Sequence, residues 1–169
     1  MRNSRTNPLP RAKIKPAQEL RKIISRLKYE GKRIVFTNGC FDLLHYGHVK
    51  YLADAKKKGD ILIVAINSDA SVKRIKGDKR PIINEKDRLK TVASLASVDY
   101  VVLFKEDTPL KLIKLLRPDI LVKGADWSKN NIVGKDYVLS YGGRVSTVRL
   151  VKGYSTTLLI KKIKKIGFR

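Results

Sequence analysis

Two histidines three residues apart mark the segment best suited to chemistry, FTNGCFDLLHYGHVKYL, at residues 36–52. They are His45 and His48, the only histidines of the chain, and Gly47 lies between them. Two imidazoles can donate hydrogen bonds to phosphoryl oxygens and stabilise charge on a pentacoordinate phosphorus without a covalent intermediate. Gly47 would keep bulk away where a phosphate approaches, and a helix beginning near it would direct N–H groups and partial positive charge there. The segment therefore predicts a phosphate-binding site.

Other chemistries compete for the same segment. Asp42, His45 and His48 could together bind a metal ion, although their spacing is not the usual helical one and no fourth ligand is apparent. Cys40 is a weaker candidate nucleophile, because it lies in an apolar stretch where small buried cysteines are common. Both imidazoles could also simply fill surface positions. The patterns G-x-x-x-x-G-K-[ST] and G-x-G-x-x-G are absent from the sequence, which argues against a kinase-type or dinucleotide-type loop.

The elements that must position these residues alternate along the chain. The apolar runs RIVFTN, ILIVAIN, YVVLF, DILVKG and RVSTVRLV are rich in Val and Ile, which is typical of parallel strands covered on both faces. One amphipathic helix is predicted after Pro16, over AQELRKIISRLKY. Further helices are predicted at 46–58, 69–76, 85–97, 109–116, 131–141 and 155–166. This alternation predicts an α/β fold, a single doubly wound Rossmann-like domain. Its five-stranded, mainly parallel sheet is expected in the order 3-2-1-4-5, with helices on both faces.

This architecture places the histidines at the edge of the sheet where ligands bind. In open α/β sheets, ligands bind outside the carboxyl ends of the strands. The first strand is predicted to end near Thr37 and Asn38, and Asn38-Gly39 lets the backbone turn sharply and approach a ligand. His45 and His48 then follow in the loop and the first helical turn, where such a fold binds its ligands.

Length and composition bound the remaining possibilities. A chain of 169 residues suits one domain, and its single cysteine excludes an internal disulfide framework and fits a reducing compartment. No apolar run approaches the roughly 18 residues that a membrane span needs. We therefore expect a cytoplasmic protein without a membrane partner. One folded domain at 16–169, including an N-terminal helix, is expected to follow a disordered basic arm at 1–15.

The net charge of +23 is concentrated in the two terminal segments, residues 1–33 and 152–169. Such a surface attracts nucleic acid by counterion release, and it equally steers small polyphosphates inward. A nucleic-acid-binding module remains a remote alternative, because these segments have few aromatic residues and no known binding motif. We therefore expect no nucleic-acid partner, and the sequence leaves a homo-oligomer open.

Two motifs resemble the nucleotidyltransferase superfamily. The stretch HYGH after a strand resembles its H-x-G-H signature, and GYSTTLLI at residues 153–160 resembles its Ser/Thr-rich loop that opens a helix. The resemblance implies that Ser155, Thr156 and Thr157 hold nucleotide phosphates. On physical grounds alone the three residues are also sound capping and first-turn residues.

Longer stretches resemble the heptose 1-phosphate adenylyltransferases, which join AMP from ATP to D-glycero-β-D-manno-heptose 1-phosphate. They are NSDASVKRIKGDKRPI, RLKTVASLASVDYVV, EDTPLKLI and PDILVKGADW, in the family's order. The resemblance implies ADP-heptose and pyrophosphate as products, for lipopolysaccharide core precursors. It covers roughly residues 32–163, without the sugar kinase that is often fused to this activity, so a stand-alone form is expected. A cytidylyltransferase of the glycerol 3-phosphate or phosphoethanolamine type is the alternative, because FDLLHYGH is shared with those enzymes.

The resemblance also implies roles for individual residues. His45 and His48 would stabilise the transition state, and Lys123 at the end of the fourth strand would add a cation beside them. Mg²⁺ is expected to arrive with ATP, held mainly by the nucleotide, so no protein metal ligands are assigned. Lys50 ranks low, because the heptose enzymes do not require lysine there. The loop residues expected to bind nucleotide are Asn38, Gly39, Cys40, Phe41 and Gly47. Arg80 and Arg88 are substrate-binding candidates that suit phosphate, although Arg88 lies in a helix pattern and could equally be a surface ion-pair partner. From their positions alone, Asp69 and Asp126 are expected to contact ribose or sugar hydroxyls of the substrates.

Overall fold

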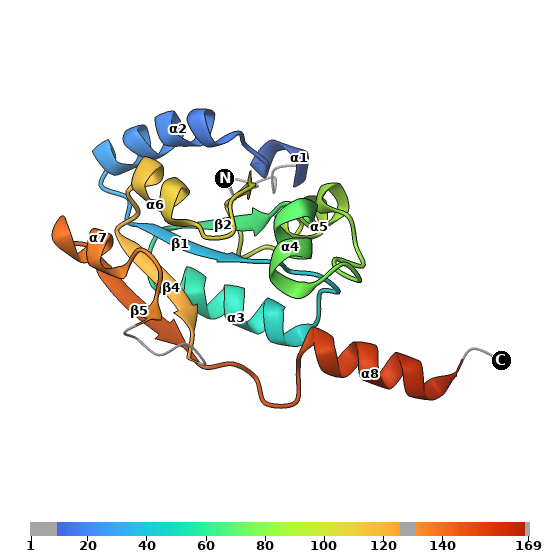
Figure 1. Cartoon of the computed structure of the whole chain (residues 1–169). Helices are drawn as coiled ribbons and strands as arrows, with labels where there is room; N and C mark the ends of the chain where they lie inside the picture. Colours follow the sequence, from blue (N-terminus) through green and yellow to red (C-terminus); the bar gives the residue numbers. More distant parts are fainter. Residues whose placement is uncertain (1–9, 126–130, 168–169) are drawn as a thin grey trace, which may run out of the picture.

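A five-stranded sheet forms the centre of the computed structural model, which describes residues 10–125 and 131–167 (Figure 1). Its strands run in the order β3-β2-β1-β4-β5, and every neighbouring pair is parallel. The fold class and the strand order predicted from the sequence are therefore confirmed. The strands are β1 (Ile34–Gly39), β2 (Ile61–Asn67), β3 (Tyr100–Phe104), β4 (Ile120–Gly124) and β5 (Arg144–Val148).

Apolar residues on both faces of the strands explain why the sheet lies at the centre. Along β1, Val35 belongs to one hydrophobic cluster and its neighbour Phe36 to another, because successive side chains point to opposite faces. Both side chains are fully buried. Buried strands of this kind need a helical layer on each face, and the chain supplies both layers.

Helices α3 (Tyr46–Lys56) and α5 (Glu85–Ala93) cover one face of the sheet. The other face is covered by α2 (Ala17–Tyr29), α6 (Leu110–Leu116) and α7 (Lys135–Ser140). This arrangement places helices on both sides of the sheet, as the alternating sequence pattern predicts.

Two further helices stand outside these layers. Helix α4 (Asp69–Lys76) follows the carboxyl end of β2, and α8 (Thr156–Ile166) projects away from the body of the molecule (Figure 1). None of the residues of α8 is buried. Within the described ranges, no helix is both long and apolar enough to cross a membrane.

The prediction of a disordered arm over residues 1–15 is wrong for residues 10–15. Residues Pro10–Lys13 form the short helix α1, and Lys13 is buried with its Nζ donating to the Leu95 carbonyl at 3.2 Å. Ile14 forms a parallel bridge with Val101 of β3, an edge strand with unpaired backbone groups. The open edge therefore orders this part of the chain, and residues 1–9 lie outside the described residues.

Two predicted helices are shorter than expected by four residues or more, and the bounds of the others differ by at most two residues. The helix predicted at 131–141 begins only at Lys135, because Gly134 has a φ of 88° and breaks the helical path. The helix predicted at 85–97 ends at Ala93. Neither change alters the layer to which the segment belongs.

Candidate active site

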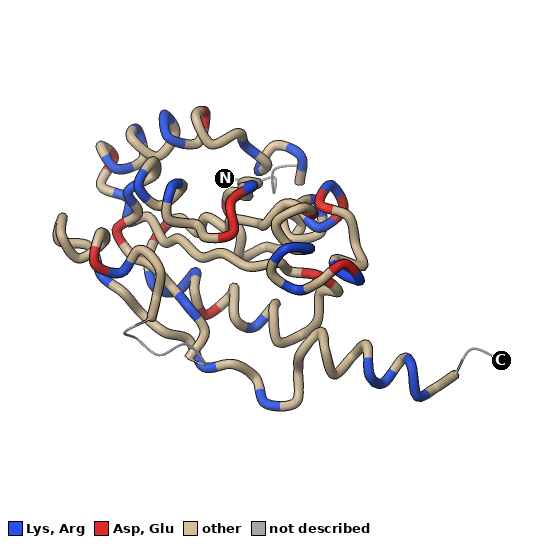
Figure 2. The backbone as a smooth tube through the Cα atoms, in the orientation of Figure 1, with Lys and Arg blue, Asp and Glu red and all other residues tan. Residues whose placement is uncertain are grey.

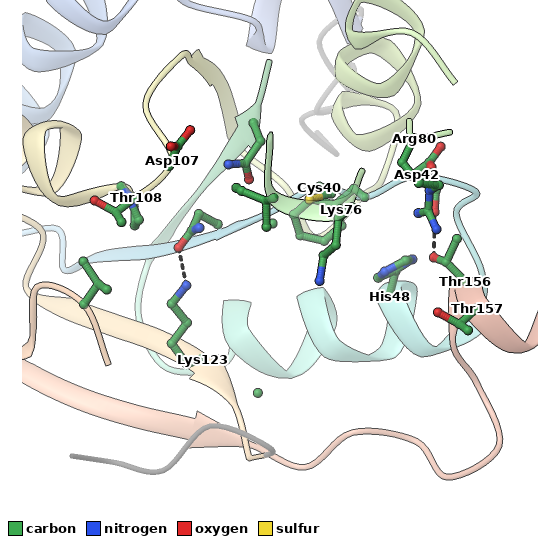
Figure 3. Close-up of a pocket in the computed structure, with 18 residues that line it drawn as sticks. Cys40, Asp42, His48, Lys76, Arg80, Asp107, Thr108, Lys123, Thr156 and Thr157 are labelled. Carbon is green, nitrogen blue, oxygen red and sulfur yellow. Dashed lines mark hydrogen bonds and ion pairs between the residues drawn. The ribbon is translucent and has the colours of Figure 1, made fainter. Parts of the chain in front are cut away.

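The predicted phosphate-binding residues meet at the carboxyl ends of β1 and β4. A cavity of about 410 Å³ lies there and is bounded by the loop after β1, the end of α4 and the start of α8 (Figure 3). A second cavity of about 370 Å³ adjoins it and shares with it the wall formed by residues 38–41 and His48. Of the residues expected at the site, those lining one or both cavities are Asn38, Gly39, Cys40, Phe41, His45, Gly47, His48, Arg80, Lys123, Ser155, Thr156 and Thr157.

The two imidazoles form a stacked pair. The ring centroids of His45 and His48 are 3.8 Å apart with an interplanar angle of 19°, and the ring of Phe41 lies 5.3 Å from that of His48. The Nδ1 atom of each histidine is buried and has no hydrogen-bond partner among the described residues. A buried polar atom without a partner is costly, and no described protein group satisfies these two nitrogens.

Burial also determines the charge of the pair. Burial, helped by the adjacent His45 and opposed by the carboxylate of Asp42, lowers the pKa of His48 to about 4. Burial lowers the pKa of His45 as well. Both rings are therefore neutral near pH 7 in the free protein, and a bound polyphosphate would raise their proton affinity.

Gly47 allows close packing of protein side chains, whereas the sequence predicts that it leaves room for a phosphate. A Cβ atom at this position would lie 2.9 Å from Cβ of Tyr154 and 3.0 Å from two ring atoms of His45. The absence of a side chain therefore lets the imidazole and the segment before α8 approach the first turn of α3. Gly39 is similar, because a Cβ there would lie 3.0 Å from the ring of Phe41.

The loop between β1 and α3 is held by Asp42. Its carboxylate is fully buried and accepts hydrogen bonds from Arg80 Nε at 2.6 Å and from the amides of Ile82 and Ile83 at 3.0 and 2.9 Å. Burial acts to raise the pKa of Asp42, but these hydrogen bonds outweigh it and lower the pKa. Thr156 Oγ1 donates to the Asp42 carbonyl at 2.9 Å, which ties the start of α8 to the same loop.

Strained backbone accompanies this tight loop. Phe41 and Leu43 have φ values of 48° and 46°, in the left-handed region that residues with side chains rarely adopt. Such conformations persist where the surroundings impose them, and they are common at functional sites. Here the contacts of Asp42 supply that constraint.

The alternative chemistries proposed for this segment find no support in the geometry. Asp42 is committed to Arg80 and two amides, and the described ranges contain no cluster of three or more His, Cys, Asp or Glu side chains that could hold a metal ion. Burial raises the pKa of the Cys40 thiol more than the nearby Lys76 and Arg88 lower it. The thiol therefore stays protonated, which is unsuited to a nucleophile.

Three cationic side chains line the larger cavity. Lys123 of β4 is buried and donates a hydrogen bond to Asn38 Oδ1, so it lies beside the end of β1 as expected. Arg80 is held by Asp42. Lys76, which the sequence analysis did not assign, extends from the last turn of α4 into the cavity and lines both cavities (Figure 3).

Arg88 is not placed where its predicted role requires. Its side chain is 1% exposed and lines neither of the two cavities. The guanidinium instead donates to the carbonyls of Ile83, Cys40 and Asn67 at 2.9, 2.6 and 2.9 Å. It therefore joins α5 to the ends of β1 and β2 as a structural group.

The remaining predicted substrate ligands are Asp69 and Asp126. Asp69 is paired with Arg88 at 2.7 Å and lies outside both cavities, so the structure does not support its predicted contact with hydroxyl groups. Asp126 lies outside the described residues. Lys50, which ranked low, pairs with Asp54 one helical turn away.

The start of α8 combines capping with a place at the cavity. Ser155 Oγ accepts a hydrogen bond from the Leu158 amide at 3.1 Å, which is the capping role that residue type alone predicts. Thr156 and Thr157 nevertheless line the larger cavity. Capping is therefore observed for Ser155, and all three residues lie at the cavities, as the predicted phosphate-binding role requires.

Sequence reasoning missed the part of the cavity near β3. Asp107, Thr108 and Pro109 line it after the end of that strand, and Asn67 does so at the end of β2. Asp107 is held by Arg74 at 2.7 Å. Polar residues that follow buried strands were the available signal, because strand ends of a parallel sheet meet at one edge.

Comparison with known proteins agrees with this geometry. The cytidylyltransferase-like family model matches residues 36–163. The chain is 59% identical over 152 residues to the bifunctional protein HldE of Geobacter metallireducens and 55% identical over 146 residues to that of Helicobacter pylori. These matches cover 90% and 86% of this chain but only 31% of each relative, so the chain spans about a third of their length.

Solved structures show the same fold. A lipopolysaccharide core biosynthesis protein from Thermoplasma volcanium superposes with a TM-score of 0.60 at 34% identity and covers 73% of this chain and 99% of its own. The pantoate-beta-alanine ligase of Francisella tularensis, at 15% identity and a TM-score of 0.55, covers 90% of this chain and 77% of its own and shares the fold alone. The family match, the HldE relatives and the histidine pair agree: the chain belongs to the cytidylyltransferase-like family and is a nucleotidyltransferase.

Proposed function

We propose that the chain transfers AMP from ATP to heptose 1-phosphate and releases pyrophosphate. The observation that carries this proposal is the stacked histidine pair at two adjoining cavities, the larger of which is lined by Lys76, Arg80 and Lys123. The HldE relatives and the Thermoplasma protein of lipopolysaccharide core biosynthesis support the heptose class of acceptor.

The reaction we propose is an in-line displacement at the α-phosphorus of ATP. An oxygen of the sugar 1-phosphate forms the new bond to phosphorus, and the bond to the bridging oxygen breaks so that pyrophosphate leaves with the electron pair. His45 and His48 would donate hydrogen bonds to phosphate oxygens whose charge increases in the transition state. The amides near Cys40 and Phe41 and the hydroxyls of α8 would hold the nucleotide phosphates.

The cations would divide between the two substrates. Lys123 and Lys76 both reach the cavity and suit the triphosphate or the incoming phosphate as point charges. Arg80 is already oriented by Asp42, so it can bind a phosphate without losing side-chain freedom at that moment.

Magnesium fits this site as a companion of ATP rather than as a resident ion. The acidic side chains lining the larger cavity are Asp42 and Asp107, and each already pairs with an arginine. The described residues thus supply cations for phosphates and no ready set of oxygen ligands for a metal. When bound, Mg²⁺ would neutralise phosphate charge, and the residues named above would orient the groups that react.

Release of pyrophosphate from ATP and heptose 1-phosphate tests the proposal. The His48→Ala variant is expected to lose at least about a thousandfold in turnover, because a preorganised donor to the transition state is removed. Lys162→Ala on α8, exposed and away from the cavities, is the control and should keep the wild-type rate. A near-wild-type rate for a folded His48→Ala variant would remove the proposed role of the pair.

A cytidylyltransferase acting on glycerol 3-phosphate or phosphoethanolamine is the second candidate, which the name of the matching family favours. The same assay separates the two when ATP and CTP are each paired with heptose 1-phosphate, glycerol 3-phosphate and phosphoethanolamine. Turnover with ATP and the heptose supports our proposal. Turnover only with CTP and a small alcohol phosphate supports the alternative.

A further inference from the structure

A large basic groove lies on the face of the sheet opposite α3, between α2 and α6. Its volume is about 660 Å³, and no residue that lines it also lines the two cavities at the candidate active site. Five cationic side chains line it and no acidic one does; they are Arg21, Lys28, Lys111, Lys114 and Arg117. Figure 2 shows basic positions along both helices that form this α2–α6 groove.

Only part of this charge is neutralised. Lys28 pairs with Asp119 at 2.7 Å, and Lys111 pairs with Glu106 at 3.4 Å. Arg21, Lys114 and Arg117 have no carboxylate within ion-pair distance among the described residues. Cations gathered in a concave wall focus a positive potential there, and an anion in the groove would relieve their mutual repulsion.

Aromatic contacts hold two of these cations in position. Arg117 adopts a left-handed backbone conformation, with φ of 46°, and its guanidinium carbon lies 4.7 Å from the centroid of Tyr141. Nζ of Lys114 lies 5.8 Å from the centroid of Tyr137. The side chains are therefore partly preorganised, which lowers the entropic cost of binding an anion.

Tyr141 stays uncharged at ordinary pH values, so its contact with Arg117 does not change with pH. Its hydroxyl donates to the Pro118 carbonyl at 2.7 Å, and burial, helped by Tyr137, raises the pKa of Tyr141 to about 12. The ring therefore stays neutral beneath Arg117. The carbonyl of Arg117 also accepts a hydrogen bond from Lys28 at 2.6 Å, which ties α2 to this side of the groove.

The floor of the groove is apolar. Ile24 and Leu116 are each 2% exposed and line it together with Leu115. A cavity of this size is typical of small-molecule sites, and arginine suits bidentate contacts to phosphate. We propose that the α2–α6 groove binds a small anion carrying two or more phosphate groups, at a site separate from the active site.

Titration of the uniformly ¹⁵N-labelled full chain with inorganic pyrophosphate tests this proposal. At low ionic strength, backbone amides of α2 and of residues 114–117 should shift along a saturable curve, distinct from the curve of residues 38–48. Arg21→Gln combined with Lys114→Gln should weaken binding at the groove at least about tenfold, because two charged donors are lost. The response of residues 38–48 should stay unchanged.

A charge-matched variant distinguishes a site from general attraction. Lys162→Gln combined with Lys165→Gln removes the same charge from the exposed surface of α8 and should leave the groove response as in the wild type. Shifts at the groove that do not saturate, or equal weakening by both pairs of substitutions, would overturn the proposal. The wild-type titration decides the matter even if a variant misfolds, and it does not depend on which substrate the active site takes.

Discussion

Replacement of Arg88 by methionine should destabilise the fold rather than weaken substrate binding. The guanidinium is almost completely buried and makes four hydrogen bonds, three to carbonyls and one to the Asp69 carboxylate. Methionine fills similar space but donates no hydrogen bond, so these acceptors lose their partner. Loss of the hydrogen bond to the Asn67 carbonyl should cost the most stability, because this bond is buried at both ends.

The expected loss in the free energy of unfolding follows from these contacts. An unsatisfied buried acceptor costs about 1–3 kcal/mol, and breaking a buried ion pair from one side costs about 3–5 kcal/mol. Since Asp69 remains one-third exposed and can be solvated, we expect a loss of about 3–5 kcal/mol in the free energy of unfolding for the whole group. Urea unfolding followed by circular dichroism measures it.

Lys90→Met on the same helix is the matched control. Lys90 is exposed and pairs with Asp87 at 3.4 Å, so its replacement should change the free energy of unfolding by less than about 0.5 kcal/mol. The reasoning is refuted if Arg88→Met unfolds like the wild type while KM for the phosphorylated acceptor rises. That outcome would make Arg88 a substrate ligand, which is one of the two roles that the sequence leaves open.

Two further predictions concern the histidine pair. Because the pKa of His48 is about 4 in the folded chain and 6.5 in an unperturbed imidazole, the unfolded chain binds a proton in this window that the folded chain does not. The free energy of unfolding should thus fall by up to about 3 kcal/mol as pH drops from 6.5 to 4, and urea titrations of His48→Gln should show a smaller fall. Gly47→Ala, whose Cβ would crowd Tyr154 and His45, should cost about 1–3 kcal/mol and reduce turnover, whereas Val49→Ala on the exposed side of α3 should do neither. Unchanged turnover for Gly47→Ala would show that the imidazole needs no such close packing.

The sheet was predictable because its strands are continuous apolar runs, which become buried only when helices cover both faces of the sheet. The same logic located the histidine loop, since parallel strands present their carboxyl ends at one edge. Local signals also identified the bounds of α4 and the capped start of α8, where Ser155 accepts an amide hydrogen bond. These features depend on short stretches of sequence, which is why they could be recognised.

Features that depend on distant partners were not predictable. Arg88 and Asp42 follow local patterns that fit a surface or a metal site, yet contacts 38 to 48 residues away decide their roles. Ile14 contacts the edge strand β3, and Lys13 contacts the segment just after α5. No local sequence pattern indicates either contact. Lys76 enters the cavity only because α4 ends above the histidine loop.

A crystal structure of the full chain with a non-hydrolysable ATP analogue tests the central claim most directly. We expect the α-phosphate within hydrogen-bond distance of the His45 and His48 rings, with the outer phosphates facing Lys76, Lys123 or the hydroxyls of Thr156 and Thr157. A triphosphate bound away from the two rings would contradict the claim, whatever the rate of the enzyme.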